Sequence, residues 1–181
     1  KTGLFGYDIL PAAPALAGAA IELVNTERRE WRLYDLLRKI RTNYDYIVVD
    51  SPPSIGLLTL NGLVAAEEVI IPVQCEYYAL EGLGQLLETI NLIRDNLGRD
   101  LKVKGALLTM YDRRQKLSRE VVKEVRRNFP GYVFSAMIPR AVSLAEAPSF
   151  GKTILQYAPS SSGSYAYREL AQEIINLDKT I

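Results

Sequence analysis

The 181-residue chain contains no histidine and only one cysteine, Cys75. Without histidine, the chain cannot build a Ser-His-Asp triad and lacks the side chain that most often acts as a general base. A lone cysteine forms no internal disulfide bond, and it leaves almost no ligands for zinc or for an iron–sulfur cluster. Because Cys75 follows the apolar stretch 69–73, we expect it to be a buried structural thiol.

Long apolar runs and glycine-rich phosphate loops are also missing. No apolar run reaches membrane-spanning length and no segment resembles a signal peptide, so we expect a cytoplasmic protein with no membrane partner. No glycine-rich loop is followed by Lys and then Ser or Thr, as in a P-loop. Since no low-complexity linker or internal repeat divides the chain, we expect one domain over residues 1–181.

The charge of the chain is unevenly distributed although the net charge is only +1. Residues 94–127 carry 11 basic and five acidic side chains, for a local balance of +6. Two interpretations remain open for this basic stretch. It binds an anionic partner such as DNA, or it is the solvated face of a helix with scattered Lys and Arg.

Apolar strands alternate with amphipathic helices along the chain. This alternation predicts an α/β fold, with a mostly parallel sheet that has helices on both faces. Ser118 is expected to be the N-cap of the helix that runs to about residue 128. The predicted helices are 15–23, 26–41, 57–66, 79–97, 118–128 and 164–177, and the predicted strands are 45–50, 68–73, 103–110 and 132–138.

The most informative segment is Tyr44–Ser54, in which four apolar residues lead directly to Asp50. A continuous apolar run predicts a strand that is buried on both faces, and ligands of open α/β sheets bind at the carboxyl ends of the strands. Asp50 is therefore a candidate Mg²⁺-holding acid of the Walker B type. From this segment alone, a turn-forming aspartate at the end of an ordinary strand is equally acceptable.

Several separated motifs, in the same order, resemble the ParA/Soj partition ATPases, which are deviant-Walker P-loop proteins. The motifs are Ile9–Pro11 with Leu16–Ala19, Asp45–Pro53 with Gly56–Asn61, Ile71–Gln74 with Glu76–Gly82, Leu108–Asp112, and Ile138–Arg140 with Leu144–Lys152. The resemblance covers roughly residues 7–175 and implies a P-loop NTPase-like domain that is incomplete at its N-terminus. The family's Lys-Gly-Gly-Val-Gly-Lys-Thr loop and switch I aspartate are absent here. We therefore interpret the chain as the C-terminal two-thirds of a ParA-type ATPase domain.

The resemblance also implies nucleotide-binding roles for particular residues. Asp50 becomes the catalytic Walker B acid, which holds Mg²⁺ through water, and 51–59 becomes the switch II segment that responds to the γ-phosphate. The remaining nucleotide-binding candidates are Pro52, Met110, Pro139 and Arg140. Met110 and Pro139 would contact adenine, or they would only pack in the core and form a turn. The cofactors are ATP and Mg²⁺ in the full-length protein, whereas this chain alone is expected to be inactive.

Family members bind duplex DNA without sequence preference when ATP has driven them to dimerise, which requires only Lys and Arg side chains on phosphates. The implied DNA-binding residues are Arg119, Lys123, Arg126, Arg127 and Arg140. Arginines at a helix end also simply suit the helix dipole. A second family arginine that contributes to DNA binding is replaced by Ser143, which predicts weaker binding or more reliance on 119–127.

The resemblance implies a partition ATPase that hydrolyses ATP to segregate chromosomes or plasmids. It would form an ATP-dependent homodimer, associate with the nucleoid and respond to a ParB-like partner. One alternative is an ATP-free relative that only binds DNA or protein. Another is a MinD-like membrane switch, which is disfavoured because the tail 171–181 has two acids and one lysine rather than a basic amphipathic pattern.

Overall fold

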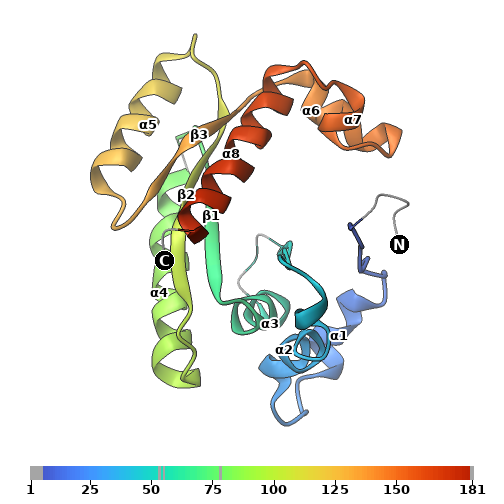
Figure 1. The fold of residues 1–181 in the computed structure, drawn as a ribbon. Coiled ribbons are helices and arrows are strands. Elements are labelled where there is room, and N and C mark those ends of the chain that lie inside the picture. Colours follow the sequence, from blue (N-terminus) through green and yellow to red (C-terminus); the bar gives the residue numbers. More distant parts are fainter. Residues whose placement is uncertain (1–5, 53, 55, 78, 180–181) are drawn as a thin grey trace. The chain divides into compact units, whose positions relative to one another are not determined.

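The computed structural model describes residues 6–52, 54, 56–77 and 79–179. The described chain divides into two compact units, residues 1–66 and 67–181, and each is considered by itself (Figure 1). The prediction of one domain over the whole chain therefore stays a prediction.

The first unit consists of short helices joined by extended and turning segments. The helix expected over 26–41 is broken into α2 with a 3₁₀ turn on either side, because Arg28 has a left-handed φ of 54° and Ile40 leaves helical geometry. The structure confirms the predicted helices at 15–23 and 57–66. The elements are α1 Leu16–Glu22, η1 Arg29–Trp31, α2 Arg32–Leu37, η2 Arg41–Asn43 and α3 Leu57–Ala65.

The strand predicted over 45–50 is wrong for this structure. Within the first unit, no strand is formed by these residues, and Val48 is 90% exposed. An apolar run becomes a strand only when a neighbouring strand satisfies its backbone N–H and C=O groups. The sequence pattern indicates that a segment prefers an extended backbone, but it does not indicate which strand would pair with that segment.

Asn61 connects the helices of the first unit. Its side chain is 5% exposed, accepts a hydrogen bond from the backbone N–H of Leu33 and donates to the carbonyl oxygens of Arg29 and Leu57. The distances are 3.1, 2.9 and 2.9 Å, respectively. A buried amide that satisfies three backbone groups fixes η1 and α2 against α3.

The second unit contains a parallel three-stranded sheet in the order β1-β2-β3 (Figure 1). The strands begin and end close to their predicted limits, and the parallel sheet with helices on both faces confirms the α/β class. The elements are β1 Glu68–Gln74, α4 Ala79–Leu97, β2 Lys102–Tyr111, α5 Lys116–Asn128, β3 Val133–Pro139, α6 Val142–Glu146, η3 Ala147–Phe150, α7 Ile154–Tyr157 and α8 Ser162–Lys179.

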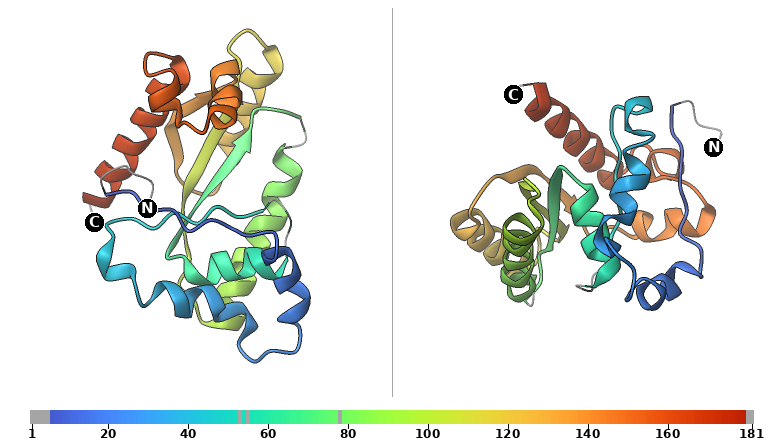
Figure 2. Two further views of the ribbon diagram at one scale, coloured as in Figure 1. Left: turned by 90° about the vertical axis from the view of Figure 1, so that its right-hand side faces the viewer. Right: turned by 90° about the horizontal axis from the view of Figure 1, so that it is seen from below.

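The helices of the second unit cover both faces of its sheet. Because parallel crossovers are right-handed, α4 and α5 lie on one face, and α8 lies on the opposite face (Figure 2). Phe134 and Ile138 of β3 pack with Ala166 and Leu170 of α8, and Ile174 extends this contact. Tyr167 and Ala171 of the same helix are exposed, Tyr167 to 43%.

One further prediction changes in the second unit. Helix α5 begins at Lys116, so Ser118 is not its N-cap; its buried hydroxyl instead donates to the carbonyl oxygen of Cys75 at 3.2 Å. Cys75 is buried as predicted, and burial raises the pKa of its thiol to about 11. The short helices α6 and α7 were not predicted, because their four or five residues are too few for a recognisable apolar period.

Candidate functional site at the carboxyl edge of the sheet

The three strands of the second unit end at one edge, where open α/β sheets bind ligands. Backbone hydrogen bonds continue just past these ends. The N–H of Cys75 donates to the carbonyl oxygen of Thr109, and the N–H of Arg140 donates to that of Tyr111, each at 2.9 Å. The chain segments that leave β1 and β3 are therefore fixed to β2.

Met110 occupies an unusual backbone position at this edge. Its φ is 54°, a left-handed value that is uncommon for a residue other than glycine. The pairing of β2 with β3 shifts register between Leu108 and Tyr111, so Met110 lies in a bulge. Tyr111 is in register with Pro139, and Met110 and Pro139 are partly accessible. The structure thus brings these two sequence-predicted residues to adjacent strand ends.

Arg140 is paired with an acid that sequence reasoning missed. Its guanidinium donates to the Glu76 carboxylate, which follows β1. Since β2 lies between β1 and β3, this ion pair crosses the end of the central strand. The Glu76 and Arg140 side chains are 50% and 45% exposed, so both remain in contact with water. No local pattern signals the pair, because the partners are 64 residues apart.

Asp112 and Arg114 form a second pair beside this edge. The Arg114 guanidinium donates from Nε and a terminal nitrogen to the two oxygens of Asp112, at 3.0 and 2.9 Å, and the backbone N–H of Arg114 donates to the same carboxylate. These hydrogen bonds lower the pKa of Asp112 to about 2. These hydrogen bonds close a local turn after β2.

Asp50, the candidate Mg²⁺ acid, belongs to the first unit, and its side chain is exposed. The segment after it is held by α3: the Thr59 hydroxyl donates to the carbonyl oxygen of Ser54 at 2.6 Å. Gly62 of α3 allows close approach, because a Cβ atom there would lie 2.7 Å from the Ser51 hydroxyl oxygen. Pro52 is exposed on this segment, and Pro53 lies outside the described residues.

An exposed carboxylate fits a magnesium ion that is held through water. Mg²⁺ keeps several water ligands and is typically bound by one or two carboxylates together with substrate phosphates. Within the described ranges, no three acidic or cysteine side chains gather as a complete metal cage. Asp50 is thus suited to Mg²⁺ that arrives with a nucleotide rather than to a resident ion.

Helix α5 carries the basic side chains that were predicted to bind DNA. Arg119, Lys123 and Arg126 follow one another at i, i+4 and i+7, so they form a stripe on one exposed face, and Arg127 adjoins it. Lys123 pairs with Glu120 at 3.3 Å, and the Arg119 guanidinium donates to the carbonyl oxygen of Arg113 at 2.7 Å. The basic side chains of α5 thus lie on its solvent-exposed face.

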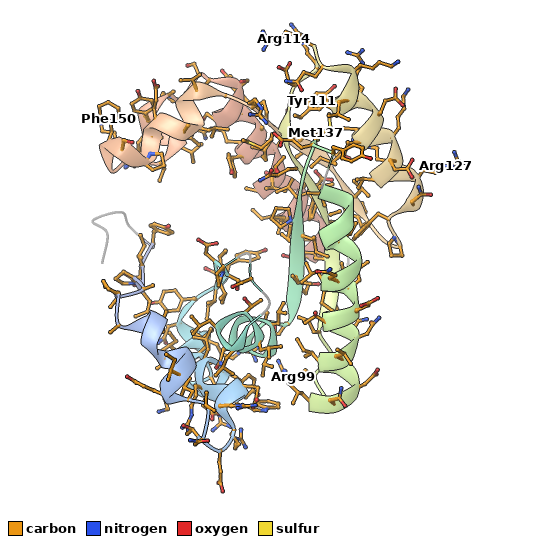
Figure 3. All side chains as sticks on the ribbon, turned by 180° about the vertical axis from the view of Figure 1, so that it is seen from behind. Arg99, Tyr111, Arg114, Arg127, Met137 and Phe150 are labelled. Carbon is orange, nitrogen blue, oxygen red and sulfur yellow. The ribbon has the colours of Figure 1, made fainter. Side chains whose placement is uncertain are left out.

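Arg140 is not part of the same cluster as the end of α5. The helix runs opposite to the strands, so Arg126 and Arg127 lie near the amino end of β3 and Arg140 follows its carboxyl end. Figure 3 shows Arg114 and Arg127 toward opposite ends of α5. Seven residues of strand separate the two ends by about 20 Å. The closeness of Arg127 and Arg140 in sequence therefore does not bring them together in space.

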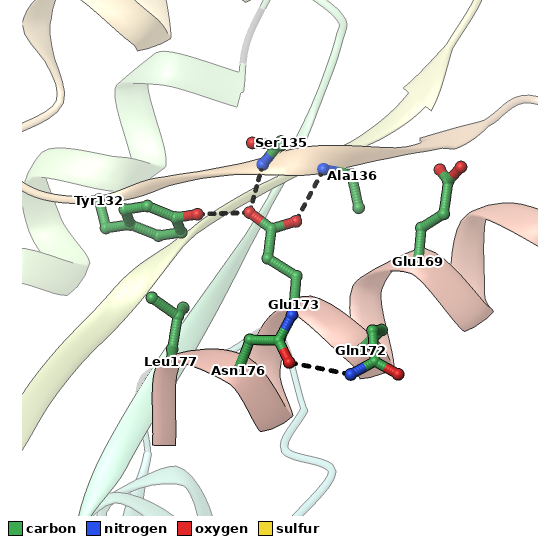
Figure 4. A pocket seen from close by; sticks show the side chains of 8 residues that line it. All are labelled: Tyr132, Ser135, Ala136, Glu169, Gln172, Glu173, Asn176 and Leu177. Atoms are coloured by element: carbon green, nitrogen blue, oxygen red, sulfur yellow. Dashed lines mark hydrogen bonds between the residues drawn. The ribbon is translucent and has the colours of Figure 1, made fainter. Parts of the chain in front are cut away.

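A shallow pocket of about 640 Å³ lies between β3 and α8, away from the strand ends (Figure 4). The Glu173 carboxylate fills its polar side by accepting hydrogen bonds from the N–H groups of Ser135 and Ala136 and from the Tyr132 hydroxyl. Because these donors are satisfied internally, the pocket offers a ligand few free polar groups. The carboxyl edge remains the better candidate site.

Comparison with known proteins identifies the fold and the family. A family model for the AAA domain matches residues 1–103. Among solved structures, the chain is similar to cobyrinic acid a,c-diamide synthase from Mycobacterium smegmatis with bound ADP and magnesium. The two share 39% sequence identity with a TM-score of 0.79, over 94% of this chain and 62% of that protein. The fold is thus that of P-loop NTPases.

Two partition proteins match almost the whole chain. The chromosome partitioning protein ParA of Myxococcus xanthus is 52% identical over 177 residues, which cover 98% of this chain and 62% of that protein. The sporulation initiation inhibitor protein Soj of Bacillus subtilis is 53% identical over 173 residues, covering 96% of this chain and 68% of that protein. The chain thus spans less than two thirds of the Myxococcus relative. It belongs to the ParA/Soj family of chromosome partitioning ATPases.

Proposed function

We propose that the protein carrying this chain is an ATP-dependent partition switch. It binds Mg-ATP, dimerises, binds duplex DNA without sequence preference, and hydrolyses ATP in response to a ParB-like partner. Chromosomes or plasmids are the cargo, and the nucleoid is the place of action. The observation that carries the proposal is identity above 50% to ParA and Soj across nearly the whole chain.

Nucleotide-binding roles are proposed for residues of each unit, taken separately. In the first unit, Asp50 holds Mg²⁺ through water and positions the phosphates for hydrolysis, Pro52 binds nucleotide, and the segment that begins at Ser51 responds to the γ-phosphate. In the second unit, Met110 and Pro139 contact the adenine base from adjacent strand ends, and Arg140 binds nucleotide beside them. A structural relative that holds ADP and magnesium supports ATP and Mg²⁺ as the cofactors.

The proposed DNA surface is the basic stripe of α5. Arg119, Lys123, Arg126 and Arg127 point to solvent and would contact phosphates, and Arg140 would add a contact at the other end of β3. Ser143 of α6 is half-buried and uncharged, so it adds no positive charge to this surface. Non-specific binding needs only such cation–phosphate pairs.

A membrane-bound role is less well supported than DNA binding. Membrane association in the MinD manner needs an amphipathic helix whose apolar face is free. In α8 the apolar residues Ala166 and Leu170 are buried against β3, and Ile174 and Leu177 pack on the same core. No helix in the described part of the chain has the length and apolar character needed to cross a bilayer.

The substitution Asp50→Asn tests the proposal in the protein expressed with the sequence that flanks this chain in its gene. Loss of the charge should abolish ATP hydrolysis and Mg-ATP-dependent dimerisation, measured by phosphate release and light scattering. Asp45→Asn, in the same extended segment, is the matched control and should retain both. Unchanged hydrolysis in Asp50→Asn would reject the Walker B role. A wild-type protein that fails to bind ATP would favour the ATP-free binding module.

A further inference from the structure

We propose that Glu76 competes with phosphate groups for Arg140, so that a phosphate must displace the Glu76 carboxylate before Arg140 binds it. The inference rests on the proposed function, in which Arg140 contacts the phosphate of a nucleotide or of DNA. Glu76 would therefore weaken the binding of the anionic ligand and so adjust the affinity of the protein for it.

The backbone fixes both members of the pair. Arg140 is anchored to β2 through its N–H, which donates to the carbonyl oxygen of Tyr111 at 2.9 Å. Glu76 directly follows Cys75, whose N–H is anchored to β2 by a 2.9 Å bond to Thr109. The carboxylate and the guanidinium therefore meet above the end of β2 because the strands place them there.

Asp112 does not replace Glu76 as the partner of Arg140. Both carboxylate oxygens of Asp112 accept hydrogen bonds from the Arg114 guanidinium. The Arg140 guanidinium is thus neutralised by Glu76, which reaches it from the neighbouring chain end. Removing the Glu76 charge would leave Arg140 as an unneutralised cation at the carboxyl edge.

The exchange of the Glu76 carboxylate for a phosphate is feasible because both members of the ion pair are exposed to water. Glu76 and Arg140 are both about half exposed, and ion pairs of this kind are worth little because water solvates and screens both charges. A phosphate offers a stronger bidentate partner to arginine, and duplex DNA adds the release of counterions. Phosphate should therefore win the competition, but with an affinity that Glu76 reduces.

The test uses the protein with its natural flanking sequence and the variants Glu76→Gln, Arg140→Gln and the double variant. Dissociation constants are measured for Mg-ATP and, over a range of salt concentrations, for duplex DNA. Glu76→Gln should tighten binding of one or both by about two- to fivefold, the range that loss of an exposed ion pair permits. In the DNA arm, Arg140→Gln should reduce the salt slope by roughly 0.9, as expected for one lost phosphate contact. The arm that responds identifies the source of the phosphate.

Two comparisons separate specific competition from a general change of charge. Glu88→Gln on α4 removes another exposed negative charge and should leave both affinities unchanged. In the Arg140→Gln background, Glu76→Gln should have no effect. Tightening that persists without Arg140, or that Glu88→Gln reproduces, would overturn the role of Glu76 while the proposed function stands. A wild-type protein that neither hydrolyses ATP nor binds DNA would remove both proposals.

Discussion

The carboxylate of Glu173 on α8 accepts a hydrogen bond from the backbone N–H of Ser135 on β3, at 2.7 Å. The same carboxylate accepts the N–H of Ala136 at 3.0 Å. These consecutive N–H groups need a partner outside the sheet because β3 bulges. The chain advances four residues on β3, from Val133 to Met137, against two residues on β2, from Ala106 to Leu108. Glu173 thus accepts hydrogen bonds from the two backbone N–H groups that the irregular strand pairing leaves without a partner in the sheet. The same contact attaches α8 to the sheet.

The contact between Glu173 and β3 predicts how the stability of the fold depends on pH. Burial raises the pKa of Glu173, but the hydrogen bonds from Tyr132, Ser135 and Ala136 lower it, and the net effect is a pKa below the ordinary value. A carboxyl group whose folded pKa is depressed stabilises the fold above its unfolded pKa of about 4.3, and this stabilisation is lost as pH falls through the folded pKa.

Glu173→Gln should therefore lower the free energy of unfolding at pH 7 by about 1–3 kcal/mol, since it removes a charged acceptor of hydrogen bonds. The difference from wild type should shrink below about pH 4.3, where the unfolded wild-type carboxyl is protonated as well. Denaturant unfolding between pH 3 and 7 measures both effects. Glu169→Gln, an exposed position of the same helix, is the control. Equal stability of Glu173→Gln and wild type at pH 7 would contradict the role of this carboxylate.

Asn61→Ala should be strongly destabilising. The substitution leaves the N–H of Leu33 and the carbonyl oxygens of Arg29 and Leu57 without this partner, at a cost of about 2–4 kcal/mol for partly buried groups. Chemical denaturation monitored by circular dichroism measures the loss. Asn96→Ala removes an exposed hydrogen bond to Leu92 and should change the stability by less than about 0.5 kcal/mol. Similar losses at the two positions would argue against a connecting role for Asn61.

Gly105→Ala should destabilise the sheet because the added methyl group has no space. A Cβ atom would lie 2.8 Å from the carbonyl oxygen of Tyr132, which already accepts the N–H of Ala106, and 3.0 Å from the ring of Phe134. Overpacking of this kind costs about 1–3 kcal/mol. Thermal unfolding should show a lower midpoint.

Gly84→Ala is the matched substitution with the opposite expected sign. Gly84 lies within α4, and a Cβ atom there meets nothing within 4 Å. The better helix propensity of alanine should raise the stability by about 0.5–1 kcal/mol. If both glycine variants changed the stability in the same direction, the space around Gly105 would not be the deciding factor.

Arg126→Gln with Arg127→Gln should weaken binding to duplex DNA in the protein with its natural flanking sequence. Each lost phosphate contact reduces the slope of log K against log salt by about 0.9, so the two together should reduce it by up to about 1.8. Binding measured at several salt concentrations gives this slope. Arg38→Gln with Lys39→Gln, an adjacent and exposed basic pair after α2, is the control. An unaltered slope would mean that the end of α5 is only a solvated face.

The alternation of apolar strands with amphipathic helices determined much of the second unit. The strands β1, β2 and β3 and the helices α4 and α8 lie within a few residues of their predicted limits, because their apolar period is long enough to be read locally. The burial of Cys75 followed from its apolar neighbours in the same way. The family itself was recognisable from short motifs in order, without knowledge of any contact.

Tertiary structure decided the features that depend on partners far apart in sequence. The apolar run that ends at Asp50 looked like a strand, yet strand pairing needs a neighbour that no local pattern supplies. Likewise, Ser118 seemed suited to cap a helix, but its hydroxyl is used by Cys75. Arg140 is predicted to bind nucleotide and DNA, and only the structure shows that it is paired with Glu76, 64 residues away. Sequence thus set which segments prefer which backbone conformation, and only the folded chain decided which polar groups meet, since hydrogen bonds and ion pairs are satisfied in space.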